Sequence, residues 1–174
     1  MGLLDRIRKV FRGSRRNIAF FIDGPNVIRK DVHINLNKVK KELEKYGKIK
    51  IAKVFLDQYA SDKLIEAMIN QGYEPVITSG DVDVSMAVDA TQQAFNPAVD
   101  IIALMTRDAD FRPVLIKAKE LGKETIVVGA EPGFSVALRN TADHVILLES
   151  EEHKIKKHRR QSGTEPKKAV KDKE

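Results

Sequence analysis

Short apolar runs recur along the middle of this chain, and most are followed by a stretch with helical spacing. The runs are nearly continuous, which is typical of strands that are buried on both faces. The helical stretches carry apolar residues three or four positions apart, and several end at a glycine, such as Gly47, Gly72 and Gly122. This alternation predicts an α/β fold, a three-layer sandwich with a mostly parallel sheet and right-handed crossovers.

The expected elements follow from these patterns. Strands are predicted at 17–22, 49–56, 74–78, 99–105, 124–128 and 144–148. Helices are predicted at 36–46, 61–70, 83–94, 109–121 and 135–140. The folded domain is therefore expected at 17–149, between a basic amphipathic helix at 1–16 and a charged, disordered tail at 150–174.

Charge is unevenly distributed along the 174 residues. Residues 1–16 carry a net charge of +5 and residues 151–174 carry +4, whereas 17–150 carry −3. Basic ends commonly contact polyanions such as RNA, although they also serve as solvated, solubilising tails. The N-terminal helix has three possible uses: packing on the domain or on a second copy as a homo-oligomer, lying on an anionic membrane, or touching RNA.

Several classes of protein are disfavoured by what the sequence omits. It has no cysteine, which excludes disulfides and Cys-based zinc sites. Its apolar runs are far shorter than the ~18–20 residues of a membrane span, and no secretory signal is visible, so a cytoplasmic location is expected. Phosphate-binding glycine loops and the serine-hydrolase elbow are missing, and the four histidines show no ligand spacing with one another.

Carboxylates follow two of the apolar runs directly. Asp23 ends the first run, in AFFIDGPN, and Asp108 and Asp110 follow the fourth, in TRDADFRPV. In an open parallel sheet, ligands bind beyond the carboxyl ends of the strands, where the strand order reverses. If the order is 3-2-1-4-5, these two strands are neighbours, and the three carboxylates enter one crevice.

The helix expected at 83–94 contributes two further acids. Asp83 and Asp89 are six residues apart, about 120° short of two turns, so they share no face cleanly. Asp83 is expected at the helix start, where the helix dipole favours an anion. Asp89 lies among apolar residues, either at the edge of the crevice or on the solvent face.

Converging carboxylates repel one another, and their pKa values rise unless a cation neutralises them. Hard oxygen ligands suit Mg²⁺ or Mn²⁺, and Asn26 offers an amide that could orient a carboxylate, a water or a phosphate. Each residue also has a simpler interpretation. Asp23 could be an ordinary turn residue, Asp108 a helix N-cap and Asp81 a loop residue.

Three segments together resemble one known family: FFIDGPN, DVDVSMAVDA and TRDADFRPVLIKAKELGKETIVVG. They look like the signatures of the NYN domain, a PIN-like group of ribonucleases related to the LabA-like proteins, over about residues 17–149. The resemblance implies a PIN-like fold and Mg²⁺- or Mn²⁺-dependent hydrolysis of RNA phosphodiester bonds. It also implies a set of catalytic residues: Asp23, Asn26, Asp83, Asp89, Asp108 and Asp110. Of these, the implied metal ligands are Asp23, Asp83, Asp108 and Asp110.

One position departs from the family pattern. Many members have a lysine three residues before the acid that aligns with Asp83, and here that residue is Gly80, followed by Asp81. The departure keeps open a non-catalytic module that binds RNA or protein, and a small-molecule phosphatase ranks third.

Basic residues beside the two motifs are candidates for RNA binding. Arg29 and Lys30 follow the first motif, and Arg107 and Arg112 flank the second acidic pair. They would contact the RNA backbone without reading its sequence. Alternatively, Arg107 and Arg112 pair with nearby acids. Phe111 is expected in the core.

Overall fold

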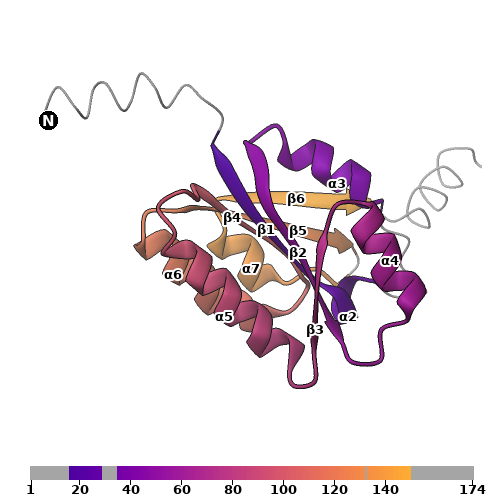
Figure 1. Cartoon of the computed structure of the whole chain (residues 1–174). Helices are drawn as coiled ribbons and strands as arrows, with labels where there is room; N and C mark the ends of the chain where they lie inside the picture. Colours follow the sequence, from indigo (N-terminus) through magenta and orange to yellow (C-terminus); the bar gives the residue numbers. More distant parts are fainter. Residues whose placement is uncertain (1–15, 29–34, 132, 150–174) are drawn as a thin grey trace, which may run out of the picture.

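The computed structural model of the chain describes residues 16–28, 35–131 and 133–149. The predicted N-terminal helix, apart from Arg16, and the predicted basic tail lie outside the described residues, as do Arg29 and Lys30. The described residues contain the predicted sheet and its helices (Figure 1).

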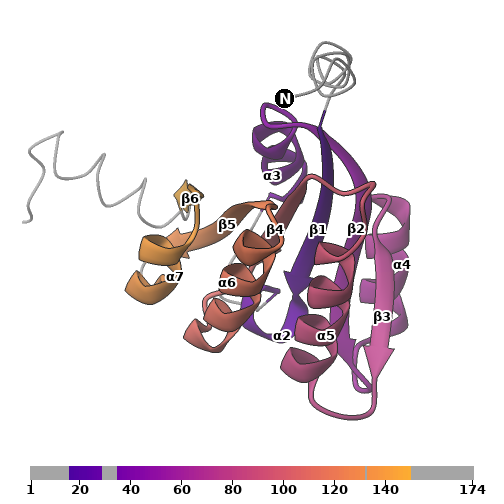
Figure 2. The same ribbon diagram turned by 90° about the vertical axis from the view of Figure 1, so that its left-hand side faces the viewer.

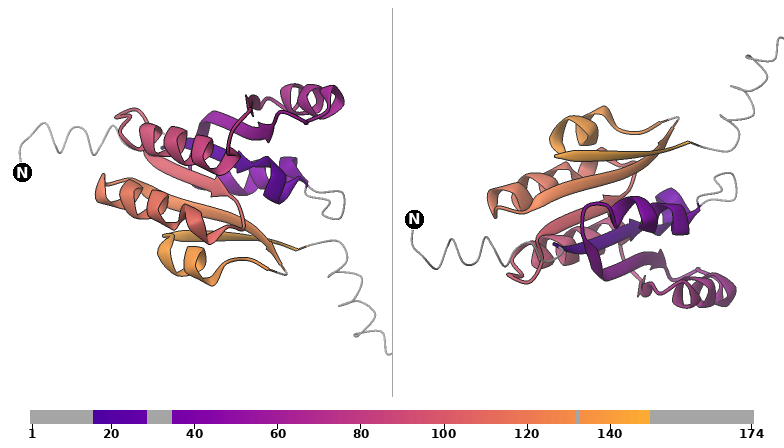
Figure 3. Two further views of the ribbon diagram at one scale, coloured as in Figure 1. Left: turned by 90° about the horizontal axis from the view of Figure 1, so that it is seen from below. Right: turned by 90° about the horizontal axis from the view of Figure 1, so that it is seen from above.

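Six parallel strands form one sheet in the order β3-β2-β1-β4-β5-β6. The strands are β1 (Asn17–Asp23), β2 (Lys48–Asp57), β3 (Glu74–Thr78), β4 (Ile101–Met105), β5 (Glu124–Glu131) and β6 (His144–Glu149). The predicted order is confirmed, and every pairing is parallel. Strands β1 and β4 are neighbours at the centre, so the direction of winding reverses between them. Strands β3 and β6 are the two edges of the sheet, and Figure 3 shows the yellow-orange C-terminal elements β6 and α7 on the opposite side of the molecule from α4, the helix that precedes β3.

Helices cover both faces of this sheet (Figure 2). One face carries α3 (Leu36–Leu43) and α4 (Asp62–Asn70), and the other carries α5 (Val82–Ala94), α6 (Arg112–Glu120) and α7 (Val136–Thr141). Successive residues of β1 alternate between the two layers: Phe20 packs in the core beneath α3 and α4, and Phe21 in the core beneath α5, α6 and α7. The three-layer prediction is therefore confirmed, with a core on each side of the sheet.

The helices differ from prediction where local chemistry intervenes. A short helix, α2 (Gly24–Val27), occupies the stretch whose residues favour a turn. The helix expected at 109–121 consists of a 3-10 turn, η1 (Ala109–Phe111), followed by α6. Pro113 lies in the first turn of α6, the place where its missing N–H costs nothing. Helix α3 ends at Leu43 because its last turn tightens to i→i+3 hydrogen bonds.

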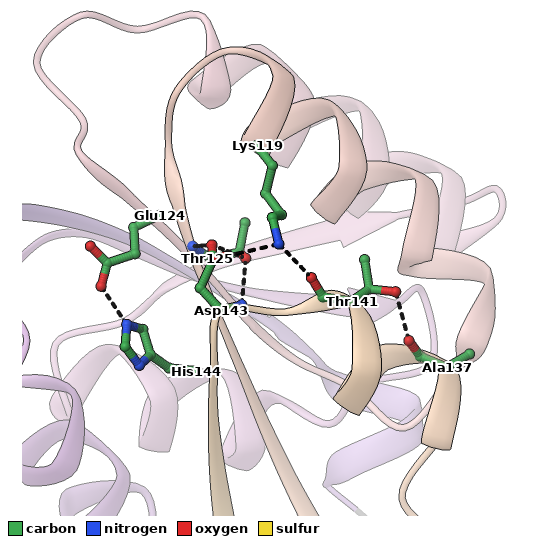
Figure 4. Close-up of polar contacts among 7 residues, drawn as sticks. All are labelled: Lys119, Glu124, Thr125, Ala137, Thr141, Asp143 and His144. Carbon is green, nitrogen blue, oxygen red and sulfur yellow. Dashed lines mark hydrogen bonds and ion pairs between the residues drawn. The ribbon is translucent and has the colours of Figure 1, made fainter.

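A polar cluster ties the amino ends of β5 and β6 to α6 (Figure 4). The Asp143 carboxylate accepts hydrogen bonds from the Thr125 N–H at 2.9 Å and its hydroxyl at 2.8 Å, and it pairs with Lys119 Nζ at 2.9 Å. Burial alone would raise the pKa of Asp143, but the bonds from Lys119 and Thr125 outweigh it and lower that pKa. Glu124 Oε1 lies 2.5 Å from His144 Nε2. The amino edge is thus locked by side-chain bonds, whereas the predicted acids lie at the carboxyl edge.

Candidate functional site

Asp23 ends β1 and is fully buried. Its Oδ1 accepts from the Asn26 N–H at 3.2 Å, and its Oδ2 accepts from Asn26 Nδ2 at 2.7 Å and Thr106 Oγ1 at 2.8 Å. These donors occupy three of about four acceptor positions on a carboxylate, and none of them neutralises its charge. Asp23 is thus held in one orientation, with one acceptor position left on Oδ1.

The DGPN sequence builds the turn that fixes Asp23. Asp23 caps α2, and Pro25 lies in the first turn of that helix. Gly24 is required by a close approach, because a Cβ there would collide with the carbonyl oxygen of Phe55 and the side chain of Leu56. Helix α2 therefore lies directly against the carboxyl end of β2.

Thr106 connects the acids of β1 and β4. It is buried immediately after β4, and its hydroxyl donates to Asp23 while accepting from the Asp108 N–H at 3.1 Å. Asp108 in turn caps η1, since its Oδ1 accepts from the Asp110 N–H at 2.9 Å. Thr106 belongs to the sequence motif, but no role was predicted for it. Its position directly after a buried strand and two residues before Asp108 could have indicated one.

The third group of acids comes from the start of α5. This helix leaves β3 at the sheet edge and packs across β2, β1 and β4, which brings its N-terminus to the centre of the carboxyl edge. Asp81 lies in the loop directly before the helix and is its N-cap, accepting from the Asp83 N–H at 2.9 Å. Asp83 lies in the first turn, as predicted.

Electrostatics show that these acids act on one another. Burial raises the pKa of Asp83 to about 6, helped by repulsion from Asp23, Asp108, Asp81 and Asp110. We call these five residues the acidic cluster. Three chain segments that are distant in sequence thus place carboxylates at one edge of the sheet.

The comparisons with known proteins agree with this geometry. A sequence model of the NYN domain matches residues 17–149. The chain belongs to the NYN domain family. This family is nuclease-like and typically metal-dependent. The predicted resemblance and the PIN-like fold are thereby confirmed.

The chain is also similar to two proteins of uncharacterized or unknown function. An uncharacterized protein of Methanocaldococcus jannaschii, MJ0482, is 52% identical over 99% of this chain and 72% of its own length. A protein of unknown function from Vibrio parahaemolyticus, VPA0982, has a crystal structure that matches with a TM-score of 0.68. It is 21% identical, over 77% of this chain and 93% of its own, and so supports the fold alone.

Asp89 is the predicted member that the NYN domain holds away from the acidic cluster. Its carboxylate forms an ion pair with Lys53 Nζ at 2.6 Å, and both side chains are 19% exposed. Lys53 lies beside Phe21 in the sheet and points to the same face, beneath α5. Asp89 is therefore not on the solvent face, one of its two expected positions. A cation on the neighbouring strand β2 draws Asp89 inward.

The two described arginines beside the acids differ in placement. The Arg107 guanidinium packs against Gly133, so closely that a Cβ at that glycine would collide with it. Arg107 therefore reaches along the carboxyl edge toward the loop after β5. Arg112 instead donates from Nε to Thr141 Oγ1 at 3.2 Å, at the end of α7. The contact of Arg112 is thus a hydroxyl and not the acid that was considered. Phe111 is buried in the core, as expected.

The acidic cluster fits a divalent ion by its chemistry. Its ligand atoms are oxygens and its side chains are all acidic, and repulsion among them adds to the effect of burial in raising the pKa of Asp83. Within residues 16–28, 35–131 and 133–149, no three acidic or histidine side chains lie close enough to hold an ion as they stand. An ion would therefore require the half-buried Asp83 and Asp108 and the exposed Asp110 to turn inward.

Among the residues that the structure describes, no helix has the length and apolar character needed to span a membrane.

Proposed function

We propose that this NYN domain is a metal-dependent ribonuclease that hydrolyses RNA phosphodiester bonds at the acidic cluster. The observation that carries the proposal is the convergence of carboxylates from β1, from the loop after β4 and from the start of α5. Mutual repulsion makes such an arrangement unfavourable unless a cation binds there. The position of the acids at the switch point of a parallel sheet, where ligands bind in such folds, supports a ligand site there.

Each acid has a distinct place in the proposed site. Asp23 lies deepest and is fixed by Asn26 and Thr106, so it would anchor an ion with its remaining acceptor position. Asp108 would be the second principal ligand, and Asp83 and Asp110 would complete the set from the more exposed side. Asp89 is assigned to the support of α5, through Lys53, and not to the chemistry.

The reaction would be attack of a water oxygen on phosphorus. A new phosphorus–oxygen bond forms while the bond to the leaving ribose oxygen breaks, and the water proton must be taken up. A bound Mg²⁺ or Mn²⁺ ion would supply water activation and stabilisation of the charge on the phosphate. A carboxylate of the acidic cluster that is not bound to the ion would take up this proton. Arg107 reaches along the same edge and is the described arginine best placed to contact the RNA backbone.

The test is cleavage of labelled single-stranded and hairpin RNAs with Mn²⁺, with Mg²⁺ and with EDTA. Wild type, Asp108→Asn and Glu120→Gln are purified identically. Glu120 is a matched control, because its exposed carboxylate lies at the far end of α6 in a surface pair with Lys117. We expect metal-dependent cleavage that falls at least about 10²-fold in Asp108→Asn and is unchanged in Glu120→Gln. Equal cleavage by all three proteins would identify a contaminating nuclease and refute the assignment.

A second candidate is a module that binds RNA or protein without cutting. Two observations favour it: the described acids are too far apart to hold an ion as they stand, and Gly80 replaces the lysine common in the family. In that case neither wild type nor Asp108→Asn cuts RNA. Both bind it with equal affinity, and the affinity falls steeply with salt.

A further inference from the structure

Tyr59 is the most exposed large hydrophobic residue among those described, with 83% of its surface accessible. It lies in the turn after β2, which two hydrogen bonds hold. The Tyr59 N–H donates to Asp57 Oδ1 at 2.8 Å, and the Ala60 N–H donates to the Asp57 carbonyl oxygen at 3.2 Å. Ser61 then caps α4. The backbone of Tyr59 is thus fixed on both sides, and the turn presents an aromatic ring to solvent at the carboxyl edge.

A pocket of about 290 Å³ lies beside this ring. Its walls come from α2, from the end of β2 and from the start of α4, and include Gly24, Pro25, Leu56 and Leu64. Apart from the phenol of Tyr59, its one ionisable lining residue is Asp57. A carboxylate disfavours a phosphate group but can accept a hydrogen bond from a base amino group or a ribose hydroxyl. The lining therefore suits a flat, uncharged group of about the size of a nucleoside.

The pocket adjoins the turn that follows Asp23. Gly24 and Pro25, which line it, directly follow Asp23 in the chain. Strand β2 is the neighbour of β1, and Asp23 pairs with Phe55, two residues before Asp57, so Asp23 and the pocket lie at the same edge of the sheet. A nucleotide chain whose phosphate lies over the acidic cluster thus brings an adjoining base to Tyr59.

We propose that Tyr59 and this pocket bind an unpaired nucleobase of single-stranded RNA beside the phosphate at the acidic cluster. The inference rests on the proposed function, since the acidic cluster defines where the phosphate lies. Stacking on an aromatic ring accepts any base, so this subsite selects for single strands and not for sequence. A base held in a duplex is already stacked and paired, and its face is not available to Tyr59.

The experiment measures binding separately from cleavage. Full-length protein carrying Asp108→Asn is titrated, with Mg²⁺ present, into a fluorescein-labelled 10-nucleotide single-stranded RNA and into a duplex of the same sequence. Tyr59→Ala, Tyr59→Phe and Phe95→Ala are compared in this background by anisotropy. Phe95 is a matched control, because it is also an exposed aromatic (61%) but follows the opposite end of α5.

We expect Tyr59→Ala to raise the Kd for single-stranded RNA by about 5- to 150-fold, the range for loss of one stacked base. Tyr59→Phe keeps the ring and should stay within about twofold, and Phe95→Ala should match the parent. Duplex binding should not respond to Tyr59→Ala. Because Tyr59 is exposed, these variants should unfold at the same temperature as the parent.

Two results separate this inference from the proposed function. If wild type does not cut RNA but Tyr59→Ala still weakens binding, the subsite stands and the nuclease assignment fails. If wild type cuts RNA but Tyr59→Ala binds like Phe95→Ala, the subsite is refuted and the nuclease assignment stands. Absence of RNA binding by the parent also overturns the subsite. The subsite is also overturned if the parent sediments as a dimer, Tyr59→Ala sediments as a monomer, and the two bind RNA with equal affinity. Tyr59 would then lie in an interface between two copies of the chain.

Discussion

Replacing Asp83 by Asn should make the metal-free protein more stable at neutral pH. Burial and repulsion from the other acids raise the pKa of Asp83 to about 6, compared with 3.8 for a free aspartate. The charged form is therefore less favourable in the folded protein than in the unfolded chain. Asparagine has nearly the same shape and carries no charge, and the hydrogen bond at this residue, from its backbone N–H to Asp81, remains.

The sign of the pH dependence follows from linkage. A carboxyl group whose pKa is raised on folding binds its proton more tightly in the folded state, so the folded protein loses stability as pH rises from about 4 to about 6. A shift of about two pKa units would correspond to about 3 kcal/mol for a fully buried group, and solvent screening at this half-buried residue reduces it to about 1 kcal/mol. Asp83→Asn should gain this amount above pH 6 and nothing near pH 4.

Urea unfolding in EDTA, followed by circular dichroism at pH 4.5 and pH 7.5, measures the difference. Glu66→Gln is the control, because it removes a carboxylate of the same charge from an exposed position on α4. Mg²⁺ or Mn²⁺ should then stabilise wild type at pH 7.5 more than it stabilises Asp83→Asn, since binding to the folded state adds to its stability. If Asp83→Asn is no more stable than Glu66→Gln at pH 7.5, the acidic cluster is not repulsive and the reasoning is wrong.

Three further predictions concern residues around the acidic cluster. Thr106→Val should destabilise the protein by about 1–3 kcal/mol in thermal unfolding and reduce RNA cleavage, because the buried Asp23 carboxylate loses a hydrogen-bond donor. Thr106→Ser keeps the hydroxyl and should retain the stability and the cleavage of wild type. Asp89→Ala should lower the free energy of unfolding in urea by about 1–3 kcal/mol, because it leaves the half-buried Lys53 without its closest partner. The double variant with Lys53→Met should recover most of that loss. If the losses of the two single variants simply add, the two residues are not coupled. Gly80→Lys should fold normally, because Gly80 is not at positive φ and a Cβ there meets nothing nearer than 3.9 Å. The added cation should lower the pKa of Asp83 in an NMR titration and raise RNA affinity several-fold. An unchanged pKa of Asp83 would show that residue 80 does not face the acidic cluster.

Much of the architecture was determined by local sequence. Continuous apolar runs and helical spacing depend on residues a few positions apart, and they located the strands and the main helices, including the cap at Ser61. They also placed Asp23 at the end of β1 and Asp108 shortly after β4. Where the signals of neighbouring residues compete, as in DGPN, the sequence indicated a turn and the chain forms α2.

The contacts that define the candidate site depended on tertiary structure. Thr106 meets Asp23 across 83 residues of chain, and Lys53 meets Asp89 across 36, and both pairs exist because of strand order and register. A spacing pattern carries no information about which strand lies beside a helix. It could therefore propose Asp89 for the crevice, but it could not predict that Lys53 on β2 forms an ion pair with Asp89. The pocket beside Tyr59 likewise arises only where α2, β2 and α4 meet. The sequence by itself determined which residues end the strands, and the packing of strands and helices decided which of those residues act together.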